Sequence, residues 1–205
     1  MNKEHAKNRI DALNKLTIFR IILVPIMVII PFLGIQGEVL DIPIQNLIII
    51  AIFAIASYTD HLDGKLARKN NQVTTFGKFA DPLADKILVL SAMLMLVEMQ
   101  KLPAWIPIIV LAREFVVSGY RLIAVEKGGK VIAASIWGKI KTATQMIAII
   151  LAFIDQSYFG GFIWEGLTGY ELVINILASS LMLISTIAAV FSGIDYLKGG
   201  KELFK

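Results

Sequence analysis

The chain contains no cysteine among its 205 residues. Disulfide bonds and thiolate metal sites are therefore excluded, and any metal ion must be held by harder ligands. Histidine is scarce as well, with two residues, and charged residues make up only 18% of the chain. The net charge of +4 is modest and says little as a total, whereas the distribution of the charges says more. We expect no nucleic-acid partner.

Hydrophobic residues, by contrast, are abundant. They make up 57% of the chain, and the mean hydropathy is +0.72. A soluble domain is usually about 45–50% apolar, and one small core cannot absorb the excess. The excess therefore predicts contact with membrane lipid. No repeat, low-complexity tract or linker divides the sequence, so we expect a single membrane domain over residues 1–205.

Apolar stretches long enough to cross a bilayer, about 20 residues, predict an all-α integral membrane protein with six transmembrane helices. The short charged segment before them, residues 1–15, has two interpretations. It is either an amphipathic helix on the membrane surface or a solvated tail. The expected spans are residues 16–34, 42–60, 82–100, 102–121, 139–157 and 171–194.

Lysine and arginine are unevenly distributed among the connections between these spans. Since basic loops stay on the cytoplasmic side, their distribution predicts a multi-pass membrane protein with both termini in the cytoplasm. The charges of spans 3 to 5 also lie at cytoplasmic ends, which predicts a hydrophilic cavity open to the cytoplasm. Basic residues are frequent in 1–20, 60–86, 113–141 and the C-terminal tail. They are absent from 34–43 and 158–171, and the connection between the third and fourth spans contains only Lys101.

Two pairs of aspartates flank the connection between the second and third spans. Asp60 and Asp63 are spaced i, i+3, which places both on one face of a helix. Asp81 and Asp85 are spaced i, i+4, and Pro82 favours a helix start with Asp81 as its cap. If the two helix ends lie side by side, the four carboxylates come together and can hold two divalent cations, such as Mg²⁺ or Mn²⁺. Alternatively, the aspartates only cap and solubilise the helices.

The spacing D60-x2-D63-G64-x2-A67-R68-x8-G77-x3-D81-x3-D85 resembles the signature of the CDP-alcohol phosphotransferase family, over residues 60–85. The resemblance implies an enzyme that binds CDP-diacylglycerol in the membrane, with an active site facing the cytoplasm. Members of that family often form homodimers, so a homodimer is an expected assembly. The implied roles are metal ligation by Asp60, Asp63, Asp81 and Asp85, general-base catalysis by Asp85, and CDP binding by Asn14, Thr17, Gly64, Ala67, Arg68, Thr74 and Gly77.

Four cations beyond the signature indicate the acceptor of the phosphatidyl group. Arg113 and Arg121 lie about two helical turns apart, and Lys139 and Lys141 follow on the next span. Together they predict a site for an anionic group such as an acceptor phosphate, although contact with anionic lipid is an alternative. The runs R113-E114-x3-S118-x2-R121 and G138-K-I-K-T142 resemble those of phosphatidylglycerophosphate synthases, which use glycerol 3-phosphate. The resemblance also implies a location in the cell membrane. Other acceptors (inositol phosphate or phosphatidylglycerol) and a cation transporter remain alternatives.

Overall fold

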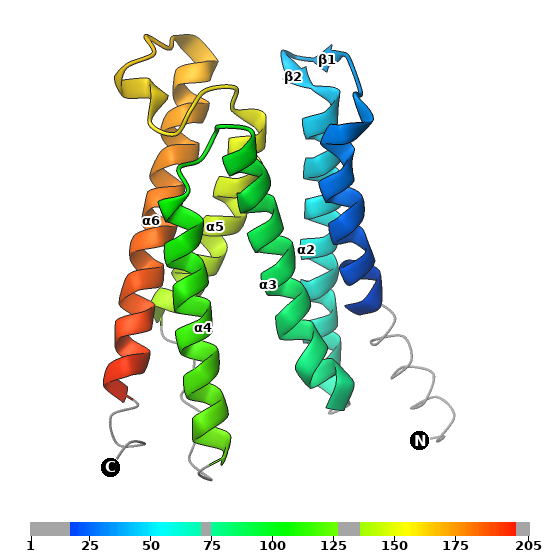
Figure 1. Ribbon diagram of the computed structural model, residues 1–205, viewed down its shortest axis with the longest axis vertical. Helices are drawn as coiled ribbons and strands as arrows, with labels where there is room; N and C mark the ends of the chain where they lie inside the picture. Colours follow the sequence, from blue (N-terminus) through cyan, green and yellow to red (C-terminus); the bar gives the residue numbers. More distant parts are fainter. Residues whose placement is uncertain (1–16, 71–74, 127–135, 200–205) are drawn as a thin grey trace. The chain divides into compact units, whose positions relative to one another are not determined.

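The computed structural model describes the backbone of residues 17–70, 75–126 and 136–199, and the side chains in these ranges except those of residues 60–82, 125 and 199. It divides into two compact units, Met1–Met95 and Leu96–Lys205. Six long helical segments make up most of the described residues, as Figure 1 shows. The predicted surface segment, residues 1–15, lies outside the described part.

The described part of the first unit starts within a helix, residues 17–29, which continues into the 3-10 helix η1 (Ile30–Leu33). Gly34 ends η1 with a left-handed backbone, φ 61°, which glycine adopts without a Cβ clash. A two-stranded hairpin follows, with β1 (Glu38–Val39) pairing antiparallel with β2 (Ile42–Pro43). Its two turn residues both have positive φ, as tight hairpin turns require. The hairpin returns the chain into α2 (Ile44–Asn70), beside the first helix (Figure 1).

The second long pair of this unit is α2 with α3 (Thr75–Glu98). Helix α2 extends ten residues beyond the predicted span, because charged residues with good helix propensity continue it after the apolar stretch ends. The start predicted for α3 is wrong: the helix begins at Thr75, so Asp81 is not its cap and Pro82 is not in its first turn. Residues 75–81 are helical, although they lie outside the apolar stretch from which the span was predicted.

The second unit contains α4 (Trp105–Glu126), α5 (Ile136–Ile154), the 3-10 helix η2 (Gly161–Ile163) and α6 (Gly169–Gly199). Helix α6 packs against both α4 and α5. Helices α5 and α6 are the two, among the described residues, that are long and apolar enough to cross a membrane. Each of the six helical segments begins within seven residues of the start of the span predicted for it.

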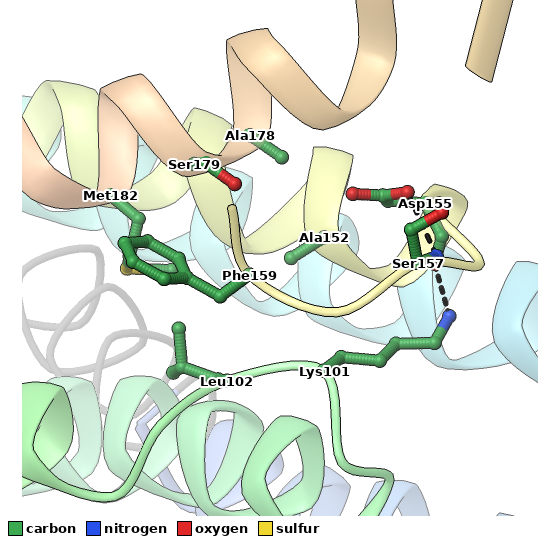
Figure 2. Close-up of a pocket in the computed structure, with 9 residues that line it drawn as sticks. All are labelled: Lys101, Leu102, Ala152, Asp155, Ser157, Phe159, Ala178, Ser179 and Met182. Atoms are coloured by element: carbon green, nitrogen blue, oxygen red, sulfur yellow. Dashed lines mark hydrogen bonds between the residues drawn. The ribbon is translucent and has the colours of Figure 1, made fainter. Parts of the chain in front are cut away.

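The connection from α5 to α6 is fastened to α6 by polar side chains. Asn175 donates to a carboxylate oxygen of Asp155 (2.7 Å) and to the carbonyl oxygen of Tyr158 (3.0 Å), and accepts from the backbone N–H of Phe162 (2.9 Å). Lys101, in the connection between α3 and α4, donates to the backbone carbonyl oxygen of Asp155 (Figure 2). A small cavity lies beside these residues, with Lys101, Ser157 and Ser179 among its lining.

Apolar and polar side chains are distributed in a way that suits a lipid exterior. Large apolar side chains such as Phe115, Leu122 and Ile108 are well exposed on α4. Conversely, Ser185 and Ser192 on α6 are fully buried. A soluble protein rarely exposes so much contiguous apolar surface, whereas lipid would cover it at no cost. The distribution therefore supports the membrane association that the composition predicts.

Candidate active site

The four aspartates lie at the two ends of one short connection in the first unit. Asp60 and Asp63 are in the last part of α2, and Asp81 and Asp85 are in the first part of α3. Only four residues, 71–74, separate the helices, so Asn70 and Thr75 are at most about 18 Å apart. Each pair lies on continuous helix, where the i, i+3 and i, i+4 spacings put its members on one face.

The structure describes only part of the predicted metal and CDP site. Asp85 is partly buried and has an interaction partner. Thr17 is almost fully buried, one turn before the fully buried Arg20 on the first helix. Outside the described side chains are Asp60, Asp63, Gly64, Ala67, Arg68, Gly77 and Asp81, and outside the described backbone are Asn14 and Thr74.

The predicted acceptor site is well described, because it lies within the second unit. Arg113 on α4 donates from Nη1 to Glu114 Oε1 (2.8 Å) and from Nη2 to Ser192 Oγ on α6 (2.5 Å). Lys141 on α5 donates to the same Glu114 oxygen (2.9 Å). All three charged side chains are largely buried, with exposed fractions of 12% for Arg113, 16% for Glu114 and 9% for Lys141. Three helices thus converge on one group of charges.

The other predicted arginine joins this group through an aromatic side chain of α6. Arg121 donates from Nη2 to the hydroxyl oxygen of Tyr196 (2.9 Å), and its guanidinium carbon lies 5.6 Å from the Tyr196 ring centroid. The guanidinium carbon of Arg113 lies 6.0 Å from the same centroid. At such distances the ring face attracts a cation. The common contact confirms that Arg113 and Arg121 lie on one side of α4.

The two lysines of α5 differ. Lys141 is buried against Glu114, whereas Lys139 is exposed. Residues two apart on a helix point in different directions. Lys139 and Lys141 could therefore contact one ligand only because lysine side chains are long. The structure therefore groups Arg113, Arg121 and Lys141, and leaves Lys139 on the outer surface of α5.

Three contributors to this cluster were not predicted. Ser192 and Tyr196 are polar residues spaced i, i+4 in an apolar helix, and that spacing is the signal that could have identified them. Glu114 follows Arg113 directly, but nothing in the sequence shows that its carboxylate accepts from two helices.

The cluster has unused capacity to bind an anion. Within the described part of the chain, Nε of Arg113 is buried without a hydrogen-bond partner. An unsatisfied buried donor of this kind costs free energy, and an anionic oxygen would satisfy it. A planar guanidinium with a free donor suits phosphate or carboxylate recognition.

Comparisons with known proteins agree with the family resemblance of the signature. The CDP-diacylglycerol–glycerol-3-phosphate 3-phosphatidyltransferase of Bacillus subtilis is 41% identical over 94% of this chain and 96% of its own length. The protein of the same name from Haemophilus influenzae is 40% identical over 91% of each chain. A probable phosphatidylglycerophosphate synthase of Mycobacterium tuberculosis is 34% identical over 90% of this chain and 78% of its own. The profile of the CDP-alcohol phosphatidyltransferase family matches residues 12–191, and the chain belongs to that family.

Proposed function

We propose that the chain transfers the phosphatidyl group of CDP-diacylglycerol to sn-glycerol 3-phosphate, giving phosphatidylglycerol phosphate and CMP. Family membership and the names of the relatives support this transfer chemistry. The observation that carries the choice of acceptor is the cationic cluster of Arg113, Arg121 and Lys141, in which Arg113 and Lys141 are largely buried. An acceptor with a phosphate group needs such a cluster, whereas one without a phosphate does not.

The donor set fits a pair of hard divalent cations, Mg²⁺ or Mn²⁺. Four carboxylates at the ends of two helices joined by four residues would repel one another unless cations compensated them. We assign Asp60, Asp63, Asp81 and Asp85 as the ligands. When bound, the ions would neutralise charge on the donor pyrophosphate and on the leaving CMP.

Asp85 is our candidate for the general base. Its carboxylate takes the proton of the acceptor hydroxyl as that oxygen attacks the phosphorus on the lipid side. The bond from this phosphorus to the CMP oxygen then breaks, and CMP leaves with the electron pair. The donor would be held by its CDP moiety, with the acyl chains in the membrane. The residues that we assign to CDP binding are Asn14, Thr17, Gly64, Ala67, Arg68, Thr74 and Gly77.

The acceptor phosphate is assigned to Arg113, Arg121, Lys139 and Lys141. The buried, unpartnered Nε of Arg113 supports this assignment, because it offers a donor to an incoming phosphate oxygen. Tyr196 holds the Arg121 guanidinium in place, so less side-chain entropy is lost when the anion binds.

The membrane arrangement that goes with this function has six spans, both termini in the cytoplasm and the active site facing the cytoplasm. The apolar helices α5 and α6 and the exposed apolar surface support it. We also retain a homodimer as part of the proposal, on family grounds alone.

Product analysis of the purified protein tests the proposal. With CDP-diacylglycerol and Mg²⁺ or Mn²⁺, we expect CMP and phosphatidylglycerol phosphate with glycerol 3-phosphate, but no product with inositol phosphate or phosphatidylglycerol. Asp85→Asn should lower CMP release by roughly 10³-fold, because the base is lost.

The matched control is Asp41→Asn, a carboxylate exposed at the hairpin turn, which should retain full activity. Undiminished CMP release by Asp85→Asn would remove Asp85 as the base. A folded wild-type protein that uses another acceptor in preference would overturn the assignment to glycerol 3-phosphate.

A further inference from the structure

Glu114 places one negative charge inside a site that we assign to an anion. Its Oε1 accepts from Arg113 Nη1 (2.8 Å) and from Lys141 Nζ (2.9 Å), so a single oxygen joins cations of α4 and α5. A carboxylate here repels any incoming phosphate, and its presence therefore requires a reason.

Stability alone is a poor reason. A buried ion pair contributes little to folding, because desolvating its charges offsets their attraction. Arg113 is also fixed independently, since Ser192 Oγ accepts from its Nη2 at 2.5 Å. Helix α6 packs against α4 and α5. The carboxylate is therefore best explained by its effect on the charge and geometry of the cations.

The charge of the cluster supplies that explanation. Arg113, Arg121 and Lys141, which the structure groups together, give with Glu114 a formal net charge of +2. Lys139 is left out of this count because it is exposed on the outer surface of α5. A phosphate monoester carries about −1.5 to −2 at neutral pH, whereas a phosphodiester, such as that of a membrane lipid, carries about −1. The cluster as built thus balances a monoester dianion, and without Glu114 it would carry one excess positive charge.

We propose that Glu114 is a positioning residue that holds Arg113 and Lys141 together and matches the charge of the acceptor site to a phosphate monoester dianion. The proposal rests on the proposed function, because it takes the cluster as the acceptor site. By removing one unit of positive charge, Glu114 limits how tightly the site holds any phosphate group, inorganic phosphate included. The charge match also favours release of the product, which bears the same phosphate group.

Inorganic phosphate is the probe that tests this proposal. We compare its inhibition constant against glycerol 3-phosphate, and its effect on the thermal midpoint in detergent, for the wild type and Glu114→Gln. Because the glutamine variant keeps the shape but loses the charge, inorganic phosphate should bind about tenfold more tightly. Glu114→Asp keeps the charge and should bind it within about twofold of the wild type. The control is Glu126→Gln, on the same helix and exposed, which should be unchanged.

Unchanged or weaker binding of inorganic phosphate by Glu114→Gln would overturn the proposal. If that variant does not fold, Glu114→Asp decides the matter, since tenfold tighter binding by it would contradict charge matching. Arg113→Gln separates this failure from failure of the proposed function. We expect it to raise the KM for glycerol 3-phosphate at least tenfold and to weaken phosphate binding, and no change in either value would show that the cluster is not the acceptor site.

Discussion

At the scale of single residues, Lys101 has an unusual environment for an ammonium group. Burial, opposed by the attraction of Asp155, lowers the pKa of Lys101 from 10.5 to about 8. The unfolded chain keeps this lysine protonated up to its ordinary pKa. Between pH 8 and 10.5 the unfolded state therefore binds more protons, and the free energy of unfolding rises with pH.

The expected contribution of Lys101 is about 2 kcal/mol between pH 8 and pH 10. Lys101→Met removes the titrating group. Between pH 8 and pH 10, the unfolding free energy of this variant should therefore rise by about 2 kcal/mol less than that of the wild type. Thermal or chemical unfolding in detergent measures both values, and Lys198→Met, at an exposed position of α6, provides the control. Equal pH dependence in Lys101→Met and the wild type would contradict the lowered pKa.

The same scale shows which parts of the cationic cluster could be predicted. Arg113 is predicted because a charge within the membrane's depth is costly and so indicates function. Arg121, Lys139 and Lys141 are predicted as cations at the cytoplasmic ends of their spans. The partners of these cations are not predicted, since the pairing of Arg121 with Tyr196 spans 75 residues and depends on how α4 packs on α6. Sequence alone indicates that a charge needs a partner, but not which residue provides it.

At the scale of elements, hydropathy predicted where helices lie better than where they end. The apolar stretches mark lipid-facing length, whereas a helix continues as long as its backbone bonds and propensities allow. Helix α2 therefore runs on to Asn70, and α3 begins at Thr75, seven residues before Pro82. Signals of the short hairpin β1–β2 were too weak to predict, because neither turn residue, Leu40 or Asp41, is a glycine or asparagine.

The α5–α6 connection offers a test at this scale. Asn175 is fully buried and makes three hydrogen bonds to the connection. Asn175→Ala would leave several of these partners unsatisfied, and we expect a loss of about 2–3 kcal/mol of stability. Ser180→Ala, at an exposed position on the same helix, should have little effect. Equal unfolding midpoints for the two variants in detergent would show that Asn175 does not fasten the connection.

At the scale of the whole molecule, the proposed topology makes a prediction that the lack of cysteine makes simple to test. Every single-cysteine variant carries one unique thiol. A membrane-impermeant maleimide added to intact cells should label Gln36→Cys and Thr168→Cys, which lie in connections without basic residues. Glu126→Cys should be labelled only after permeabilisation. Labelling of Glu126→Cys in intact cells would exclude the proposed orientation, in which both termini lie in the cytoplasm.

Helix α6 carries polar anchors toward both of its ends, and this sets a length. Asn175 binds the α5–α6 connection, and Tyr196 binds Arg121. At about 1.5 Å per residue the two anchors are about 32 Å apart, close to the thickness of an average bilayer's apolar layer. Shorter acyl chains would make the apolar layer thinner than the length of α6 between these anchors, and a helix relieves such a mismatch by tilting.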